Sequence, residues 1–351
     1  MSDNFVGVEY YKSQFDRIQR LIIDGQAQID KDLTKEVIAT MRQLESQIGQ
    51  DLDRRLVFED KHTNLNTLER ILHVVEHGEV EATTTGVYEI DQAWRWRKGE
   101  TNIWTGYGNE GKSAFLNFLT LIKCKIDKNE KAAIFSPENQ PAEFFYLDFV
   151  NSILGRKPDK RDRDEVVAIY EWLEKNIFFV YPDGLFTLDK IHDEMRFLID
   201  TKGVTTCIID PYLKVAHDYA GLQEHHYVAR FMTTIEHFAR QNQVSYHVVA
   251  HQNTPYLAPD QSDFPKPNGY KIKGGGSFYD GADNVNIVWR PCRTSNYQDP
   301  TVIFESQKIK KQKLVARPNM VTMGFDFHKQ RYVTQTGQDM YDLAVNNELG
   351  F

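Results

Sequence analysis

The stretch Gly106-Tyr-Gly-Asn-Glu-Gly-Lys-Ser113 decides the fold class of this chain. It fits the pattern G-x-x-x-x-G-K-[ST], and it lies after a β-rich run and before a helical run. Backbone N–H groups of such a turn curl around phosphate oxygens, and the following helix adds the positive end of its dipole. Lys112 would give a point charge to a phosphoryl group, and Ser113 a hard oxygen ligand to Mg²⁺. The predicted phosphate loop comprises Gly106, Gly108, Asn109, Glu110, Gly111, Lys112, Ser113 and Ala114.

Short β-rich runs alternate with helical runs on both sides of this loop. Strands alternating with helices indicate βαβ units, so we predict an α/β fold with a mostly parallel central sheet. Two final β-rich runs, 320–327 and 331–334, predict an antiparallel hairpin at the sheet edge. The stretch 253–276 predicts a long loop. The other expected strands are 102–105, 132–136, 177–181, 206–210, 245–251, 284–290 and 302–306, and the expected helices are 113–126, 142–154, 164–175, 188–201 and 227–242.

The first 80 residues have a different pattern. Three apolar stripes with spacings of three and four residues predict amphipathic helices between residues 10 and 80. No residue pattern in this part suggests chemistry. We expect a helical N-terminal region over 1–82 that serves oligomerisation or linkage, a core over 83–338 and a C-terminal tail over 339–351.

Composition excludes several classes of protein. The chain has 351 residues, 41% hydrophobic and 26% charged, which is typical of a globular protein rather than a disordered one. We find no apolar run long enough for a membrane span and no secretory signal pattern. Three widely spaced cysteines exclude a disulfide scaffold and favour a reducing cytoplasm. The net charge is −8, but residues 266–317 hold 10 Lys+Arg against 4 Asp+Glu, so a local basic surface is expected.

Three further strand ends carry candidate site residues. Thr206-Cys-Ile-Ile-Asp210 is an apolar strand that ends in a carboxylate, which suits an Mg²⁺ site beside the phosphate loop. Glu138 follows the strand after the phosphate-loop helix, where it could orient water or merely stabilise a helix N-terminus. His251 ends a later strand and could hydrogen-bond a phosphate, although a histidine at a strand end is often only structural.

Together these segments resemble the RecA-like core of hexameric replicative helicases, the DnaB family and the phage primase-helicases. The resemblance covers roughly residues 83–335. It rests on Thr84-Thr-Gly-Val-Tyr-Glu-Ile-Asp91 before the phosphate loop, on Phe135-Ser-Pro-Glu138, on Cys207-Ile-Ile-Asp210-Pro-Tyr, on Ala250-His251-Gln252, and on Lys273-Gly-Gly-Gly-Ser277 followed by Asp283 and Ile287-Val-Trp-Arg290.

The resemblance implies roles for these residues and for others. Glu138 would be the hydrolytic base, Asp210 would hold Mg²⁺ with Ser113, and His251 would sense the γ-phosphate. Arg290 and Phe327 would stack on the two faces of the nucleotide base. The loops 217–226 and 253–276 would line a central channel for single-stranded DNA. The implied DNA contacts in the second loop are Lys266, Lys271, Lys273, Gly274 and Gly275.

The sequence departs from the family at the residue that completes a neighbouring subunit's site. The family has K-x-R there, whereas this chain has Lys308-Ile-Lys310 and no arginine before Arg317. The trans-acting cation is then Lys308, Lys310 or Arg317, or it is absent. We favour Lys310 as the finger with Lys308 as its support, because alternate residues on a strand share a face. A solvated basic hairpin that attracts DNA is the alternative.

The resulting expectation is an ATP-dependent, Mg²⁺-dependent DNA helicase that forms a homo-hexameric ring on single-stranded DNA. Nucleotide would bind between subunits, and a separate primase, loader or polymerase could be a partner. The expected location is the cytoplasm, that of a host cell if the source is a phage. Two rivals stay open: a RecA-type recombination or strand-annealing ATPase, and a KaiC-like regulatory ATPase that does not bind DNA. The net charge of +6 on residues 266–317 argues against the regulatory ATPase.

Overall fold

The computed structural model describes residues 71–72, 74–76, 78–79, 81–217, 223–257 and 259–345. The chain divides into two compact units, Met1–Glu79 and Val80–Phe351. The amphipathic stripes predicted between residues 10 and 80 lie almost wholly outside the described residues, so their role in oligomerisation stays a prediction. Among the described helices, none is both long and apolar enough to cross a membrane.

The second unit is built on one sheet of nine strands in the order β3-β2-β4-β5-β1-β6-β7-β8-β9. The first six of these strands run parallel, and β7, β8 and β9 continue the sheet antiparallel. The strands are β1 Thr101–Gly106, β2 Ala132–Phe135, β3 Ile177–Val180, β4 Thr206–Ile209, β5 Ser245–His251, β6 Asn284–Trp289, β7 Thr301–Ile309, β8 Met320–Asp326 and β9 Arg331–Val333. The α/β fold with a mostly parallel sheet and an antiparallel edge is confirmed.

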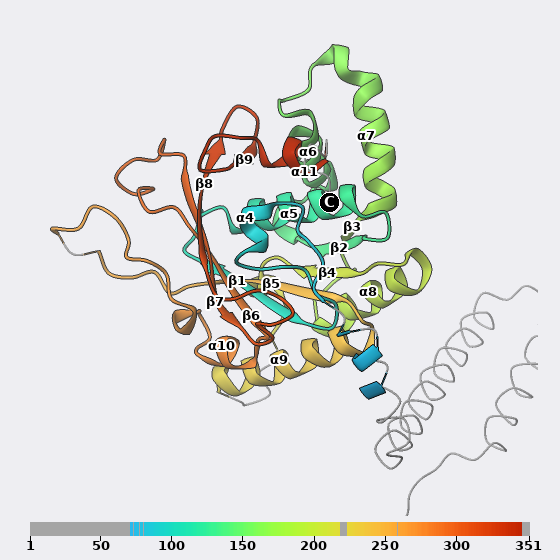
Figure 1. Ribbon diagram of the computed structural model, residues 1–351, viewed down its shortest axis with the longest axis vertical. Helices are drawn as coiled ribbons and strands as arrows, with labels where there is room; N and C mark the ends of the chain where they lie inside the picture. The colour runs from blue at the N-terminus through green and yellow to red at the C-terminus, as the bar shows by residue number, and fades with distance from the viewer. Residues whose placement is uncertain are drawn as a thin grey trace, which may run out of the picture. The chain divides into compact units, whose positions relative to one another are not determined.

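Helices cover both faces of the sheet (Figure 1). One apolar cluster packs α4, α5, α6, α7 and α11 on one face, and a second packs α8, α9 and α10 on the other. The helices are α4 Tyr88–Asp91, α5 Lys112–Ile126, α6 Ala142–Leu154, α7 Arg163–Asn176, α8 Leu188–Lys202, α9 Glu224–Gln241, α10 Ser277–Gly281 and α11 Met340–Val345, with 3₁₀ turns η1 Pro137–Asn139, η2 Lys160–Asp162, η3 Tyr212–Lys214 and η4 Gly269–Lys271.

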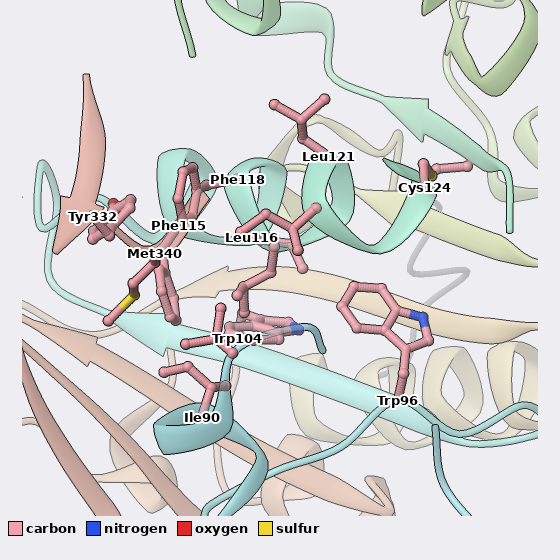
Figure 2. Close-up of a cluster of buried hydrophobic side chains, with 14 of the residues drawn as sticks. Ile90, Trp96, Trp104, Phe115, Leu116, Phe118, Leu121, Cys124, Tyr332 and Met340 are labelled. Carbon is pink, nitrogen blue, oxygen red and sulfur yellow. The ribbon is translucent and has the colours of Figure 1, made fainter. Parts of the chain in front are cut away.

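Helix α5 is held rigidly because its apolar face is fully buried against β1. Phe115 and Leu116 pack over Trp104, and Figure 2 shows this cluster closed by Tyr332 and Met340 from the end of the chain. Burial of each such side chain contributes about 1.5–3 kcal/mol. A rigid α5 fixes the phosphate loop at its N-terminus.

Two expectations need correction. The sequence predicts a tail over 339–351, yet Met340–Val345 form α11, and Met340 and Tyr341 are buried against the core. Helix α9 begins at Glu224, three residues earlier than expected, because Glu224, His225 and His226 continue its helical turn. The expected loop 217–226 is therefore shorter, because its last three residues belong to α9.

Candidate nucleotide site at the carboxyl edge of the sheet

The predicted chemical residues come together at the carboxyl ends of the parallel strands. In the sheet register Gly106 lies beside His251, and Phe135 lies beside Ile209. The segments that follow these four positions carry the phosphate loop, Glu138 and Asp210. In open α/β sheets, this edge is where ligands bind.

The phosphate loop packs closely on the neighbouring strand. Gly106 has φ +149, and a Cβ atom there would lie 2.3 Å from the carbonyl oxygen of Val288 in β6. Only glycine avoids that clash with backbone. Lys112 is 4% exposed, and its Nζ donates to the carbonyl of Tyr107 at 2.6 Å. Burial lowers the pKa of Lys112 to about 8, while Asp210 and Glu110 oppose this shift. An anion in the loop would stabilise the charged form further.

Ser113 and Asp210 form the oxygen pair predicted for a divalent cation. The Ser113 hydroxyl donates to Asp210 Oδ1 at 2.8 Å. Burial raises the pKa of Asp210 to about 6, whereas the Ser113 hydrogen bond and the Lys112 charge lower it. Hard oxygens of this kind suit Mg²⁺, which usually takes its other ligands from phosphate and water. Among the described residues, no group of three or more His, Cys, Asp or Glu side chains could hold a metal.

Glu138 lies in η1, directly after β2. Its side chain is 52% exposed, and its Oε1 lies 3.4 Å from Lys214 Nζ in η3. The nearest long helix, α6, begins only at Ala142, so stabilisation of that helix dipole does not explain Glu138. An exposed carboxylate beside the phosphate loop can orient a water molecule. Lys214 was missed in the sequence, although a lysine four residues after Asp210 was a usable signal.

The end of β5 is hydrogen-bonded to the long loop 253–276. The Lys273 N–H donates to the His251 carbonyl at 2.8 Å, and Gln252 Nε2 donates to the Asn268 carbonyl at 2.8 Å. Burial, followed by the Lys112 charge, lowers the pKa of His251. A neutral imidazole beside the phosphate loop is therefore tied to the loop predicted to bind DNA.

The candidate DNA contacts differ in their surroundings. Lys266 forms an ion pair with Glu305 at 2.7 Å, whereas Lys271 and Lys273 are exposed. Gly274 packs on α9, where an added Cβ would lie 3.1 Å from Val228. Gly275 has φ +97, an added Cβ there would meet no atom within 4 Å, and its N–H donates to the Ile272 carbonyl at 2.9 Å.

Arg290, directly after β6, and Phe327, in the β8–β9 turn, are brought together. The Arg290 guanidinium carbon lies 5.6 Å from the centre of the Phe327 ring, and Phe327 is 42% exposed. Arg290 Nη2 donates to the carbonyls of Tyr297 at 2.8 Å and Asp299 at 3.1 Å. Tyr297, whose ring centre lies 5.2 Å from the same guanidinium, was not predicted. These groups form an aromatic and cationic surface suited to a nucleotide base.

Lys308 and Lys310, the favoured candidates for the trans-acting cation, lie at the amino ends of the parallel strands, opposite the phosphate loop. We call this end the amino edge. Asn284, at the start of β6, pairs with Asn102 on one side and Ile309 on the other. Strand β7 ends at Ile309, so Lys310 lies just beyond it and the shared-face argument fails. Lys310 pairs with Asp283 at 3.2 Å, and Lys308 Nζ donates to the Tyr279 carbonyl at 2.7 Å.

Solved structures share this architecture. The chain aligns with a DnaB-like replicative helicase, solved in a study of its interactions with primase, over 93% of this chain and 76% of that one, with TM-score 0.66 and 13% identity. It aligns with a second solved structure, an ATPase domain, over 78% of this chain and 99% of that one, with TM-score 0.62 and 14% identity. The core has the fold of the DnaB-like replicative helicases. The resemblance predicted from the sequence is confirmed at the level of the fold.

One curated relative is similar in sequence. The Twinkle homolog protein, chloroplastic/mitochondrial, of Arabidopsis thaliana is 25% identical over 235 residues. The match covers 61% of this chain but only 31% of that protein, so the chain spans about a third of its relative's length. No protein-family model matches the chain.

Proposed function

We propose that this chain hydrolyses nucleoside triphosphate with Mg²⁺ and uses the energy to move on single-stranded DNA and unwind duplex. The observation that carries the proposal is the convergence of Lys112, Ser113, Asp210, Glu138 and His251 at one edge of the sheet. These residues come from four separate segments, and each has the chemistry that phosphoryl transfer needs at its position. The helicase fold and the Twinkle relative support the same conclusion.

Each side chain has a distinct task in hydrolysis. Lys112 would bind the β- and γ-phosphates, and the anion would stabilise its charged form. Ser113 and Asp210 would hold Mg²⁺, which neutralises charge on the phosphate oxygens when it is bound. Glu138 would accept a proton from the attacking water. Arg290 and Phe327 would hold the base at the far end of the nucleotide.

The link between hydrolysis and movement would run through the end of β5. His251 would lose a hydrogen-bond partner when the γ-phosphate leaves. The bonds from Lys273 and Asn268 to this strand end would then carry a shift into loop 253–276. Lys271, Lys273 and the backbone near Gly275 would contact DNA phosphates there.

Assembly as a homo-hexamer would complete the site. The phosphate loop and Lys310 lie at opposite edges of the sheet, so they can meet only across an interface between copies. The N-terminal region would hold the ring together, and primase is a candidate partner because one structural neighbour was studied with it.

A two-step assay tests the function. Hydrolysis of ATP with Mg²⁺ should rise when single-stranded DNA is added, and a forked duplex should be unwound. DNA-stimulated hydrolysis without unwinding would instead support the RecA-type ATPase, and hydrolysis that ignores DNA would support the regulatory ATPase. Electron microscopy with nucleotide then distinguishes a ring from a filament.

A further inference from the structure

The phosphate loop contains a carboxylate that does not serve the phosphates. Glu110 is 1% exposed, yet it lies within the loop that should attract anions. A buried charge is costly unless it is paired and hydrogen-bonded. A free carboxylate here would also repel the phosphates that Lys112 attracts. Its partners therefore decide its role.

Those partners lie beyond the end of β6. One oxygen of Glu110 accepts the backbone N–H of Arg290, and the other lies 3.4 Å from Nε of Arg293. Burial raises the pKa of Glu110, and these two contacts oppose the shift. The carboxylate thus faces the strand end rather than the phosphate-binding side of the loop.

These contacts fix the residue proposed to stack on the base. Glu110 holds the backbone of Arg290, while the carbonyls of Tyr297 and Asp299 hold its guanidinium. The Arg290 guanidinium lies over Phe327 in this arrangement. The close approach of Gly106 to Val288 brings the start of the phosphate loop against β6, just before Arg290. Phosphate loop and base surface are therefore joined by one buried side chain.

We propose that Glu110 is a positioning residue that holds Arg290 and its loop in register with the phosphate loop and thereby sets affinity for the nucleotide base. The inference rests on the proposed nucleotide site. Glu110 touches neither phosphate nor base in this scheme. It acts through Arg290, so its loss should weaken binding of whole nucleotides more than binding of a bare phosphate chain.

The experiment compares two probes, Mg²⁺–ATP and Mg²⁺–tripolyphosphate, on the full-length protein by calorimetry. Glu110→Ala removes both contacts, Glu110→Gln removes the charge, and Arg293→Gln removes the partner from outside the phosphate loop. Glu100→Gln is the matched control, because Glu100 is also 1% exposed and pairs with Arg97 at 3.0 Å, but at the opposite edge of the sheet.

Glu110→Ala should weaken ATP binding roughly tenfold, the size expected when one hydrogen bond to a charged group is lost. Glu110→Gln and Arg293→Gln should show a smaller loss in the same direction and should not add when combined. All three should weaken tripolyphosphate binding less than ATP binding, because a changed charge near Lys112 acts on both probes whereas the position of Arg290 acts on ATP alone. Glu100→Gln should leave both affinities unchanged and alter only the melting temperature.

Equal losses for ATP and tripolyphosphate would show that Glu110 only shapes the phosphate loop, and the inference would be overturned. Unchanged ATP affinity in Arg293→Gln and Glu110→Gln would overturn it as well. If Glu110→Ala does not fold, Arg293→Gln still decides the question. A wild-type protein that binds neither probe would instead contradict the proposed function itself.

Discussion

The two edges of the central sheet use charge in opposite ways. At the amino edge the buried carboxylates have internal cations: Asp283 pairs with Lys310 at 3.2 Å, and Glu100 pairs with Arg97 at 3.0 Å. At the carboxyl edge, Lys112 forms no ion pair with any described residue and donates only to a carbonyl of its own loop. The ion pairs at the first edge stabilise the protein. At the second edge Glu110 and Glu138 also have internal cations, but the buried Lys112 has no ion-pair partner among the described residues.

This difference separates structural ion pairs from candidate site residues. A buried cation whose charged form is destabilised by burial and which has no direct ion pair favours an anion from outside. Variants at the carboxyl edge should therefore change binding and turnover, and variants at the amino edge should change folding first. Three predictions test this contrast, and a fourth concerns the pH dependence of stability.

The largest effect is expected for Lys112→Ala. Loss of the only cation in the phosphate loop should lower kcat/KM by about 10³-fold or more. Arg97→Ala is the control at the other edge and should lower the melting temperature with little change in kcat/KM. Steady-state hydrolysis measured beside thermal unfolding checks both. If the two variants lost activity to the same extent, the contrast between the edges would not hold.

Glu138→Gln should separate binding from chemistry at the carboxyl edge. The amide keeps the size of the side chain but cannot take a proton, so kcat should fall about 10²-fold or more. Nucleotide affinity should stay within about twofold because Glu138 is not a phosphate ligand. Single-turnover hydrolysis and equilibrium binding are the measurements. Retention of more than about a tenth of wild-type kcat, a change under ~1.4 kcal/mol, would show that Glu138 is not the base.

Lys310→Ala tests whether one amino-edge cation also serves a neighbouring subunit. If Lys310 acts in trans, kcat should fall by roughly tenfold or more, since such cations contribute strongly to phosphoryl transfer. Mixing Lys310→Ala subunits with Lys112→Ala subunits should then restore some activity, because both lesions can fall at one shared site. If Lys310→Ala only destabilises the fold and mixing restores nothing, Lys310 is no more than the partner of Asp283.

The last prediction concerns stability rather than turnover, at two buried histidines away from the carboxyl edge. Burial lowers the pKa of His192 and His247 to about 3, so both are neutral in the folded protein. In the unfolded chain both histidines would take up protons below about pH 6.5, whereas in the folded protein they would not. The free energy of unfolding therefore falls as the pH falls below about 6.5. Between about pH 7 and 5 each should remove about 2 kcal/mol from the free energy of unfolding.

Denaturant unfolding at several pH values measures this slope. The variant His192→Gln should be less stable at neutral pH, because it loses the hydrogen bond to the Tyr246 hydroxyl at 2.8 Å, but its stability should depend less on pH. An unchanged pH dependence would show that His192 is not protonated on unfolding.

Much of the site could be predicted because each residue ends a strand or closely follows one. Apolar strands such as 206–209 and 245–251 are visible as short buried runs, and their last residues must meet at one edge if the strands are parallel. That rule placed Asp210, Glu138 and His251 beside the phosphate loop. It could not place Lys310, because the end of β7 at Ile309 depends on pairing with β6, including an irregularity between Val285 and Asn286.

The sequence by itself determined the fold class, the phosphate loop and the segments around it, because these depend on local periodicity and on contiguous motifs. Only the tertiary structure decided the partners of Glu110, Lys214 and Lys310. Those contacts join residues far apart in the chain, and their distances follow from how strands and loops pack. The sequence does not indicate which residue a carboxylate in a loop will pair with. Glu110 pairs with Arg290 and Arg293 because it is buried against the end of β6.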